Sequence, residues 1–170
     1  MFGVPVEGFA QKSKEAATEG IVLLKNEGGM LPLTQEDKIS VFGRPQIEYY
    51  RSGTGSGGAV NVEYATNILD GVENSNLNID ETLVEKYKNW LKDHPFDNGG
   101  GGWACEPWFQ KDMPIDEAFA KEQAAKTNKA LYIIGRTAGE DKDNAIWQGS
   151  YILTDEEKEK IQFAGTSDPS

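Results

Sequence analysis

Two short apolar runs that each stop at a glycine are the clearest structural signal in the chain. Residues 39–43 read ISVFG, and residues 130–134 read ALYII before Gly135. Short apolar runs of this kind are typical of strands buried inside a parallel sheet. The pattern therefore predicts two buried strands that lie far apart in the sequence.

Around these strands, apolar residues recur at helical spacing. The spacing predicts helices over residues 9–26, 64–73, 80–93, 115–126 and 155–163. Asp80 is placed to cap the third helix, and Thr154 with Glu157 forms the capping box that opens the last one. Strands that alternate with helices predict an α/β fold, a layered α/β sandwich with a mainly parallel sheet.

Two loops are too distinctive to be plain connectors. Residues 44–58 include two tyrosines, two arginines and the run GTGSGG, which predicts either an ordered binding surface or a mobile glycine loop. The run lacks the lysine of a phosphate-binding loop. Residues 96–109 place four glycines before Trp103 and Trp108. These tryptophans either stack on a sugar ring or anchor their loop to the core, and the sequence leaves both interpretations open.

The most informative loop follows the second predicted strand, where residues 135–143 read GRTAGEDKD. In parallel α/β sheets, ligand sites lie beyond the carboxyl ends of the strands. Glu140 follows a glycine at such an end, which makes it a candidate for proton transfer. The alternative is an ordinary solvated loop with no chemical role.

Composition limits the function classes. The chain has 28 acidic and 17 basic residues, a net charge of -11, which argues against nucleic-acid and anionic-membrane partners. One cysteine, Cys105, and one histidine, His94, supply too few ligands for the usual metal sites, so we expect no metal and no cofactor. His94 is expected at the end of a helix. With no secretory leader and no membrane span, we expect a cytoplasmic protein that can form a homo-oligomer.

Five motifs spaced along the chain match those of one known family. They are EAATEGIVLLKNE at residues 15–27 with LPL at 31–33, ISVFG at 39–43, GSG at 55–57, GRTAGEDKD at 135–143, and LT at 153–154. On these motifs the chain resembles the C-terminal α/β sandwich domain of family 3 glycoside hydrolases, the β-glucosidase and β-xylosidase family. Each motif is weak alone, whereas the combination and its order are specific.

The resemblance implies roles for individual residues. Glu140 matches the general acid/base of a retaining β-glycosidase. The expected activity is that of a β-glucosidase, the hydrolysis of terminal β-linked glucosyl residues. Asp143 matches the aspartate of the same loop. We expect Arg51 and Ser56, together with Trp103 or Trp108, to line the side of the site that holds the aglycone. The expected partners are a β-glucoside or oligosaccharide substrate and the family's (β/α)8 barrel, which carries the nucleophilic aspartate.

The chain also departs from the family pattern. Asp141 replaces a glycine common after the glutamate, and Asn144 replaces a common arginine. No barrel and no nucleophile segment occur, so we expect residues 1–163 to form a partial sandwich domain truncated at its C-terminal end, with an irregular tail over 164–170, and to be inactive alone. The alternative is a non-catalytic carbohydrate-binding or interaction domain. An N-acetylglucosaminidase is less favoured, because that branch resembles enzymes that use a histidine–aspartate pair on the barrel.

Overall fold

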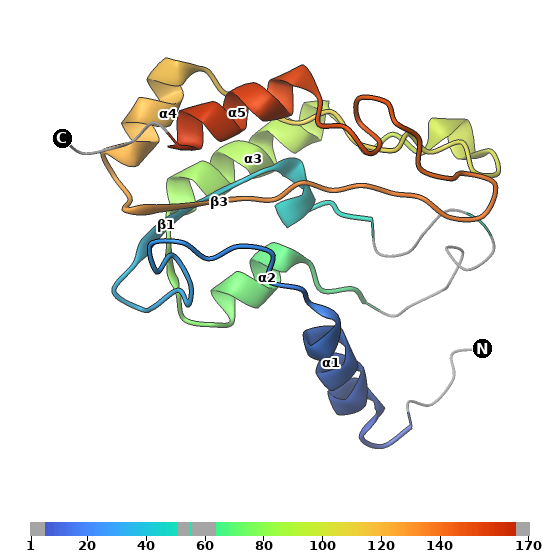
Figure 1. The fold of residues 1–170 in the computed structure, drawn as a ribbon, viewed down its shortest axis with the longest axis horizontal. Helices are drawn as coiled ribbons and strands as arrows, with labels where there is room; N and C mark the ends of the chain where they lie inside the picture. Colours follow the sequence, from blue (N-terminus) through green and yellow to red (C-terminus); the bar gives the residue numbers. More distant parts are fainter. Residues whose placement is uncertain (1–5, 51–54, 56–63, 166–170) are drawn as a thin grey trace. The chain divides into compact units, whose positions relative to one another are not determined.

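The computed structural model describes residues 6–50, 55 and 64–165 (Figure 1). They form two compact units. One contains the described residues up to Leu33 together with Tyr64, and the other contains the rest from Thr34 onward.

The first unit contains helix α1, Phe9–Gly20, whose side chains are all exposed. The predicted helix over residues 9–26 was therefore too long. Glycine is a poor helix former, and the β-branched Ile21 and Val22 that follow Gly20 favour extended backbone. Ile21 accordingly adopts φ −75° and ψ 127°, which ends the helix.

The second unit is built on a three-stranded parallel sheet in the order β2-β1-β3. The strands are β1 (Lys38–Phe42), β2 (Asn78–Ile79) and β3 (Lys129–Tyr132). Both predicted strands are confirmed as neighbours in one sheet, with β1 at its centre. Strand β2 was missed, because two residues, one of them polar, produce no recognisable periodicity.

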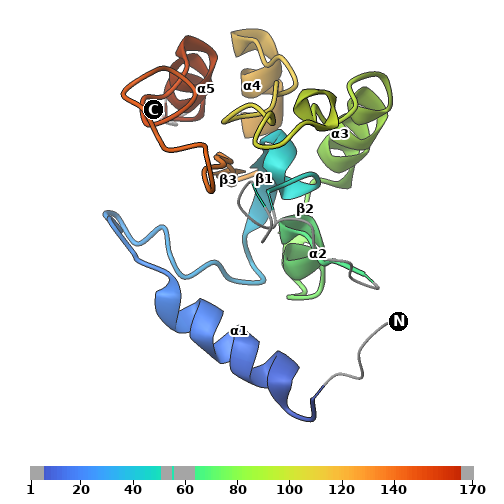
Figure 2. The ribbon, with the colours of Figure 1, turned by 90° about the vertical axis from the view of Figure 1, so that its right-hand side faces the viewer.

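Helices cover both faces of this sheet, as an α/β sandwich requires (Figures 1 and 2). Helices α3 (Glu81–Asp93), α4 (Glu117–Ala124) and α5 (Asp155–Gly165) lie on one side, and α2 (Ile68–Glu73) lies on the other. Short 3-10 turns follow β1 (Arg44–Gln46) and occupy the glycine loop (Gly99–Gly101).

The capping residues explain where the helices begin. Asp80 accepts hydrogen bonds from the amides of Thr82 and Leu83, which confirms it as the cap of α3. Asn67 and Asp70 form a capping box, so α2 begins at Ile68 and not at residue 64 as predicted. Asp116 caps α4 by accepting a hydrogen bond from the amide of Phe119, which moves the start of that helix to Glu117. The capping box of Thr154 and Glu157 is also present, and α5 runs past the predicted end to Gly165.

The core lies on both faces of β1. Both Ile39 and Val41 are fully buried, and so is Ser40 on the opposite face of the strand. A cluster of Phe42, Leu83, Tyr87 and Met113 joins β1 to α3 and to the chain before α4. Burial on both faces explains why β1 shows a continuous apolar run and no alternation.

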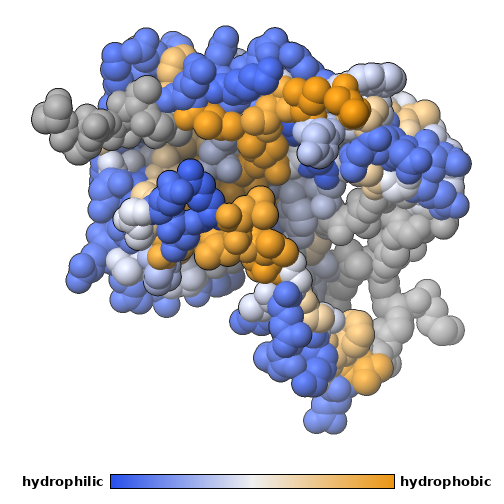
Figure 3. Space-filling model, in the orientation of Figure 1, coloured by the Kyte–Doolittle hydropathy of each residue, from blue (hydrophilic) through white to orange (hydrophobic). Residues whose placement is uncertain are grey.

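Hydrophobic side chains also reach the surface, and Figure 3 shows several on the face viewed in Figure 1. The exposed large hydrophobic residues of the second unit include Ile134 after β3, and Ile146, Trp147, Tyr151 and Ile152 in the loop before α5. Among the described residues, no helix has the length and hydrophobicity needed to cross a bilayer.

The end of β1 depends on a glycine. Gly43 has φ +96°, a conformation that side chains other than glycine rarely adopt. A Cβ at this position would lie 2.1 Å from the carbonyl oxygen of Ile133, which directly follows the neighbouring strand β3. The amide of Gly43 also donates a 2.8 Å hydrogen bond to the buried Tyr87 hydroxyl. Only glycine therefore lets β1 and β3 pair to their carboxyl ends.

Substituting Gly43 with alanine tests this constraint. We expect Gly43→Ala to lower the free energy of unfolding by about 2–4 kcal/mol, because the new Cβ clashes with backbone and the φ angle is strained. Gly71→Ala is the matched control, since Gly71 lies in α2 with open space around it. We expect that control to raise stability by about 0.5–1 kcal/mol. Urea unfolding of both variants measures the difference, and similar midpoints for the two would contradict the constraint.

Candidate active site

The candidate acid, Glu140, lies at the tip of a tight turn. Gly139 and Lys142 close the turn through two reciprocal backbone hydrogen bonds of 3.1 and 3.0 Å. Glu140 and Asp141 form its exposed tip, and Asp141 adopts φ +60°. The turn thus presents a carboxylate to solvent on a short hairpin just beyond β3.

Gly55 from the loop after β1 packs directly against Glu140. A Cβ built at Gly55 would lie 2.5 Å from the Glu140 Cβ and 2.6 Å from its Oε2. Gly55 also has φ +96°, so its backbone takes a path that glycine permits. The GSG segment thus contacts the Glu140 turn at this residue, a contact that the sequence did not predict. Arg51 and Ser56, the other residues proposed from this loop, lie outside the described residues.

The tryptophan loop meets the same turn from another direction (Figure 1). The indole Nε1 of Trp103 donates a 2.8 Å hydrogen bond to Oδ2 of Asp141. The backbone amide of Thr137 donates to the carbonyl of Trp108 at 2.9 Å, and Lys142 Nζ lies 5.3 Å from the centroid of the Trp108 ring. Segments that are far apart in the sequence therefore converge on Glu140.

The two tryptophans occupy different environments. Trp103 is 55% exposed. Trp108 is half-buried, packs edge-on against Trp147 at 5.3 Å, and its Nε1 is buried without a hydrogen-bond partner among the described residues. Trp108 thus has the contacts of a loop anchor, while Trp103 is largely exposed beside the turn.

Asp143 lies just beyond the turn. It is exposed and makes no hydrogen bond or ion pair within the described part of the chain. Asp143 follows Glu140 closely in the sequence, but no described contact joins the two side chains. Its proposed role in substrate binding stays a prediction.

Arg136 holds the start of the loop to helix α5. Its Nη1 and Nη2 donate to the two carboxylate oxygens of Glu157 at 2.7 and 2.5 Å, and its Nε donates to the carbonyl of Ser150. Burial alone would raise the pKa of Glu157, but the hydrogen bonds from Arg136 and Thr154 outweigh it and hold that pKa below its usual value. Arg136 therefore acts as a structural anchor between the start of the loop and α5.

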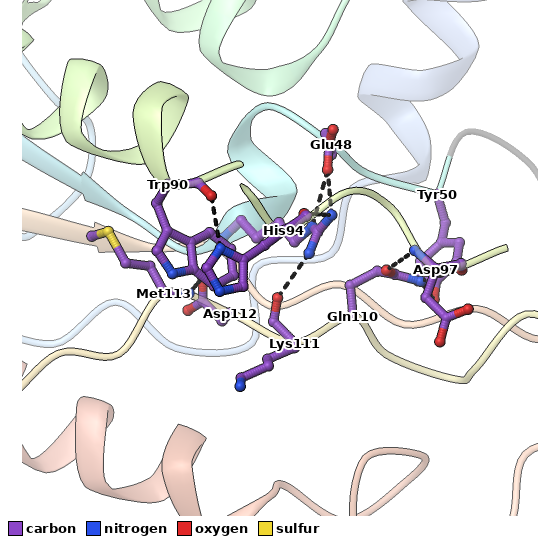
Figure 4. Close-up of polar contacts among 10 residues, drawn as sticks. Glu48, Tyr50, Trp90, His94, Asp97, Gln110, Lys111, Asp112 and Met113 are labelled. Carbon is purple, nitrogen blue, oxygen red and sulfur yellow. Dashed lines mark hydrogen bonds and ion pairs between the residues drawn. The ribbon is translucent and has the colours of Figure 1, made fainter. Parts of the chain in front are cut away.

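Another arginine, the buried Arg44, organises the chain on both sides of the tryptophan loop (Figure 4). Its guanidinium is 2% exposed and donates to Glu48 and to the carbonyls of His94 and Lys111. Sequence reasoning missed this residue. The i,i+4 spacing of Arg44 and Glu48 is the signal that could have identified the pair. His94 itself caps the C-terminus of α3, as predicted.

Gln110 adds a second tie to the same region (Figure 4). It exchanges two hydrogen bonds of 2.8 Å with the backbone of Asp97 and donates to the Tyr50 hydroxyl at 3.0 Å. The Tyr50 hydroxyl in turn donates to the carbonyl of Pro107. These bonds link the loop that leads to Gly55 with the loop that carries Trp103.

The described residues also line an open groove of about 740 Å³ next to Arg44. Its lining includes His94, Phe109, Gln148 and Glu156. Neither Glu140 nor Trp103 contributes to it, so the groove and the turn are separate features.

The arrangement can perform proton transfer at one point. Glu140 is an exposed carboxylate on a short turn that two other loops contact, which suits a group that gives and takes a proton. No group of three or more histidine, cysteine, aspartate or glutamate side chains that could bind a metal occurs among the residues that the structure describes.

Comparison with known proteins identifies the family. Residues 21–165 match the model of the glycosyl hydrolase family 3 C-terminal domain. The chain is 47% identical over 150 residues to a β-glucosidase of Ruminococcus albus and 32% identical over 136 residues to β-glucosidase A of Butyrivibrio fibrisolvens. These alignments cover 88% and 79% of this chain, but only 16% of each relative.

Solved structures of β-glucosidases support the same family. A β-glucosidase from Paenibacillus barengoltzii shares the fold with a TM-score of 0.91 and 55% identity, covering 96% of this chain and 18% of that protein. β-Glucosidase 3B from Thermotoga neapolitana, in complex with glucose, gives a TM-score of 0.79 and 32% identity, covering 93% of this chain and 22% of that protein. The resemblance noted from the motifs is therefore confirmed, and the chain spans about a fifth of these proteins or less.

The Arg136–Glu157 pair yields a pH prediction. Because the pKa of Glu157 is lowered in the folded state, its stabilising effect is complete above the unfolded value near 4.5 and is lost as pH falls through the lower folded value. We expect Glu157→Gln to reduce stability at pH 7 by about 2–3 kcal/mol and to flatten the loss of stability on acidification.

Chemical unfolding between pH 7 and pH 3 measures this effect. Glu159→Gln is the matched control, because Glu159 is an exposed residue of the same helix. If Glu157→Gln keeps the acid sensitivity of the unsubstituted chain, the anchoring role of the pair is wrong.

Proposed function

Because the chain belongs to family 3 of the glycoside hydrolases, as part of their C-terminal domain, we propose that Glu140 is the general acid/base of a retaining β-glucosidase. The observation that carries the proposal is the placement of Glu140. It lies at the tip of a hairpin beyond β3, packed by Gly55 and flanked by Trp103. The matching β-glucosidases supply the activity and the substrate class.

The proposed mechanism needs two carboxylates. In retaining glycosidases they lie about 5–5.5 Å apart, one as nucleophile and one as acid/base. We propose that an aspartate on a (β/α)8 barrel attacks the anomeric carbon while the Glu140 carboxylic acid donates its proton to the departing glycosidic oxygen. The Glu140 carboxylate then takes a proton from water, which attacks the anomeric carbon and releases glucose from the aspartate.

The remaining proposed residues belong to the aglycone side. Trp103 offers an exposed aromatic face next to the turn, and sugar rings pack their apolar C–H faces on such surfaces. Trp108, Asp143, Arg51 and Ser56 are further candidates for this side. The exposed Ile146, Trp147 and Tyr151 after the turn suit contact with the barrel, since exposed apolar groups mark interaction surfaces.

The test uses a complete enzyme. This chain replaces the matching segment of the Paenibacillus barengoltzii β-glucosidase, and kcat/KM is measured for cellobiose and for a dinitrophenyl β-glucoside. We expect Glu140→Gln to lower kcat/KM for cellobiose by about 10²–10⁴, because the alkoxide leaving group needs a proton. Dinitrophenolate leaves without protonation, so kcat/KM for the dinitrophenyl glucoside changes little. The kcat for this substrate falls, because the attacking water has lost its base. Azide attacks without a base, so added azide restores kcat.

Glu159→Gln is the control and should leave both substrates unaffected. Equal losses for both substrates, or no loss for either, would contradict the acid/base role of Glu140. If the unmodified chain hydrolyses these substrates without a barrel, the chain itself must carry the second carboxylate that the mechanism needs.

The contact between Gly55 and Glu140 makes a separate prediction. In the same enzyme we expect Gly55→Ala to displace the Glu140 side chain and to lower kcat/KM for cellobiose by at least about tenfold, again sparing the dinitrophenyl substrate. Gly28→Ala is the matched control, because Gly28 also has a positive φ (+69°) but open space around its Cα. Equal effects of both substitutions would attribute the loss to backbone strain and not to the contact with Glu140.

A further inference from the structure

Asp141 combines a strained backbone with a long-range hydrogen bond. Its φ of +60° is uncommon for any residue except glycine. Conformations of this kind persist where the surroundings hold them, and they cluster at functional sites. At this position the hold is visible, because the Asp141 carboxylate accepts the 2.8 Å hydrogen bond from Trp103 Nε1.

The partner of this bond comes from a loop rich in glycine. Three successive glycines before Trp103 have positive φ, between +62° and +78°. Gly99 packs tightly on the backbone of Cys105, which closes the loop, and Lys142 Nζ donates to the Ala104 carbonyl at 3.4 Å. The two residues that follow Glu140 therefore both bind this loop. The Asp141 carboxylate accepts from the Trp103 indole, and the Lys142 ammonium donates to the Ala104 carbonyl.

We propose that Asp141 is a positioning residue for Glu140, acting through its hydrogen bond to Trp103. A carboxylate that accepts an indole N–H makes a charge-assisted bond, which is stronger and more directional than a neutral one. The bond fixes the tip of the turn against the tryptophan loop and so fixes the direction in which the neighbouring Glu140 points. The inference rests on the proposed acid/base role of Glu140.

A purely structural role predicts a different pattern of variants. If Asp141 mattered only through its backbone angle, Asp141→Gly would be harmless or favourable, since glycine tolerates φ +60°. If the hydrogen bond positions Glu140, Asp141→Gly and Asp141→Ala should both be impaired. Asp141→Asn keeps an acceptor oxygen and should retain most of the function. Trp103→Phe keeps an aromatic ring, loses the donor, and should behave like Asp141→Ala.

The first experiment examines the bond in the full chain, independently of any activity. Proton exchange of the ¹⁵N-labelled indole groups is measured by NMR, with the Trp103 signal identified by its loss in Trp103→Phe. We expect Trp103, although 55% exposed, to exchange more slowly than Trp147, which is 64% exposed, and to lose this protection in Asp141→Ala. If the Trp103 indole proton exchanges at the same rate in the unsubstituted chain and in Asp141→Ala, the proposal is overturned.

The second experiment measures the consequence in the complete enzyme described above. We expect Asp141→Ala and Asp141→Gly each to lower kcat/KM for cellobiose by about tenfold to a hundredfold, while kcat/KM for the dinitrophenyl glucoside stays nearly unchanged. Trp103→Phe should lower kcat/KM for cellobiose by a similar factor. The double variant Asp141→Ala/Trp103→Phe should lose no more than either single variant, because both remove one bond. Asp93→Ala, an exposed aspartate at the end of α3, is the control.

The outcomes separate this inference from the proposed function. Additive losses in the double variant, full activity of Asp141→Gly, or equal losses on both substrates would each overturn the positioning role. If Glu140→Gln itself has no selective effect on cellobiose, the acid/base assignment fails first, and the NMR result then still reports on the Trp103–Asp141 bond.

Discussion

The close approach of two backbones at the carboxyl end of the sheet is the constraint on which the site depends. Gly43 and Ile133 lie so near each other that no Cβ fits between them. Because β1 and β3 stay paired to this point, the loops that follow them start side by side. One of these loops carries Gly55 and the other carries Glu140, and their contact follows from the shared starting edge. The site is thus a consequence of parallel pairing at a glycine.

Electrostatic pairs then turn two long loops into a defined surface. The buried guanidinium of Arg44 satisfies carbonyls at His94 and Lys111, on either side of the tryptophan loop. Arg136 performs the corresponding task after β3 through its paired hydrogen bonds to Glu157. Buried charges are tolerated only when they are paired, so both arginines require that their loops take one arrangement. Neither arginine reaches the proposed reacting atoms, yet both help to decide where those atoms lie.

Much of this could be predicted from the sequence, for identifiable reasons. The strands were visible because burial on both faces of β1 produces an uninterrupted apolar run, and the caps at Asp80 and Thr154 act within one helical turn. The Glu140 turn was recognised from its family motif and its place after a strand. What escaped prediction depends on contacts between distant residues. The Trp103–Asp141 bond spans 38 positions, and nothing in either local pattern indicates it. The end of α1 was misjudged for a related reason, since apolar Ile21 and Leu24 fit a helical period but lie exposed on chain beyond the helix.

The substitution at residue 141 shows how a departure from a family pattern can still keep the local geometry. Glycine is the usual residue after the glutamate in the motif, and the turn here still has the positive φ that glycine would take freely. An aspartate in that conformation costs backbone energy, and its carboxylate also adds negative charge next to Glu140. The indole N–H that binds the carboxylate offsets these costs, because a charge-assisted hydrogen bond stabilises both the charged group and the strained conformation that holds it. A carboxylate that belongs to one domain and must act on a substrate held by another gains most from such rigidity, since its direction has to be set before the two domains' groups meet.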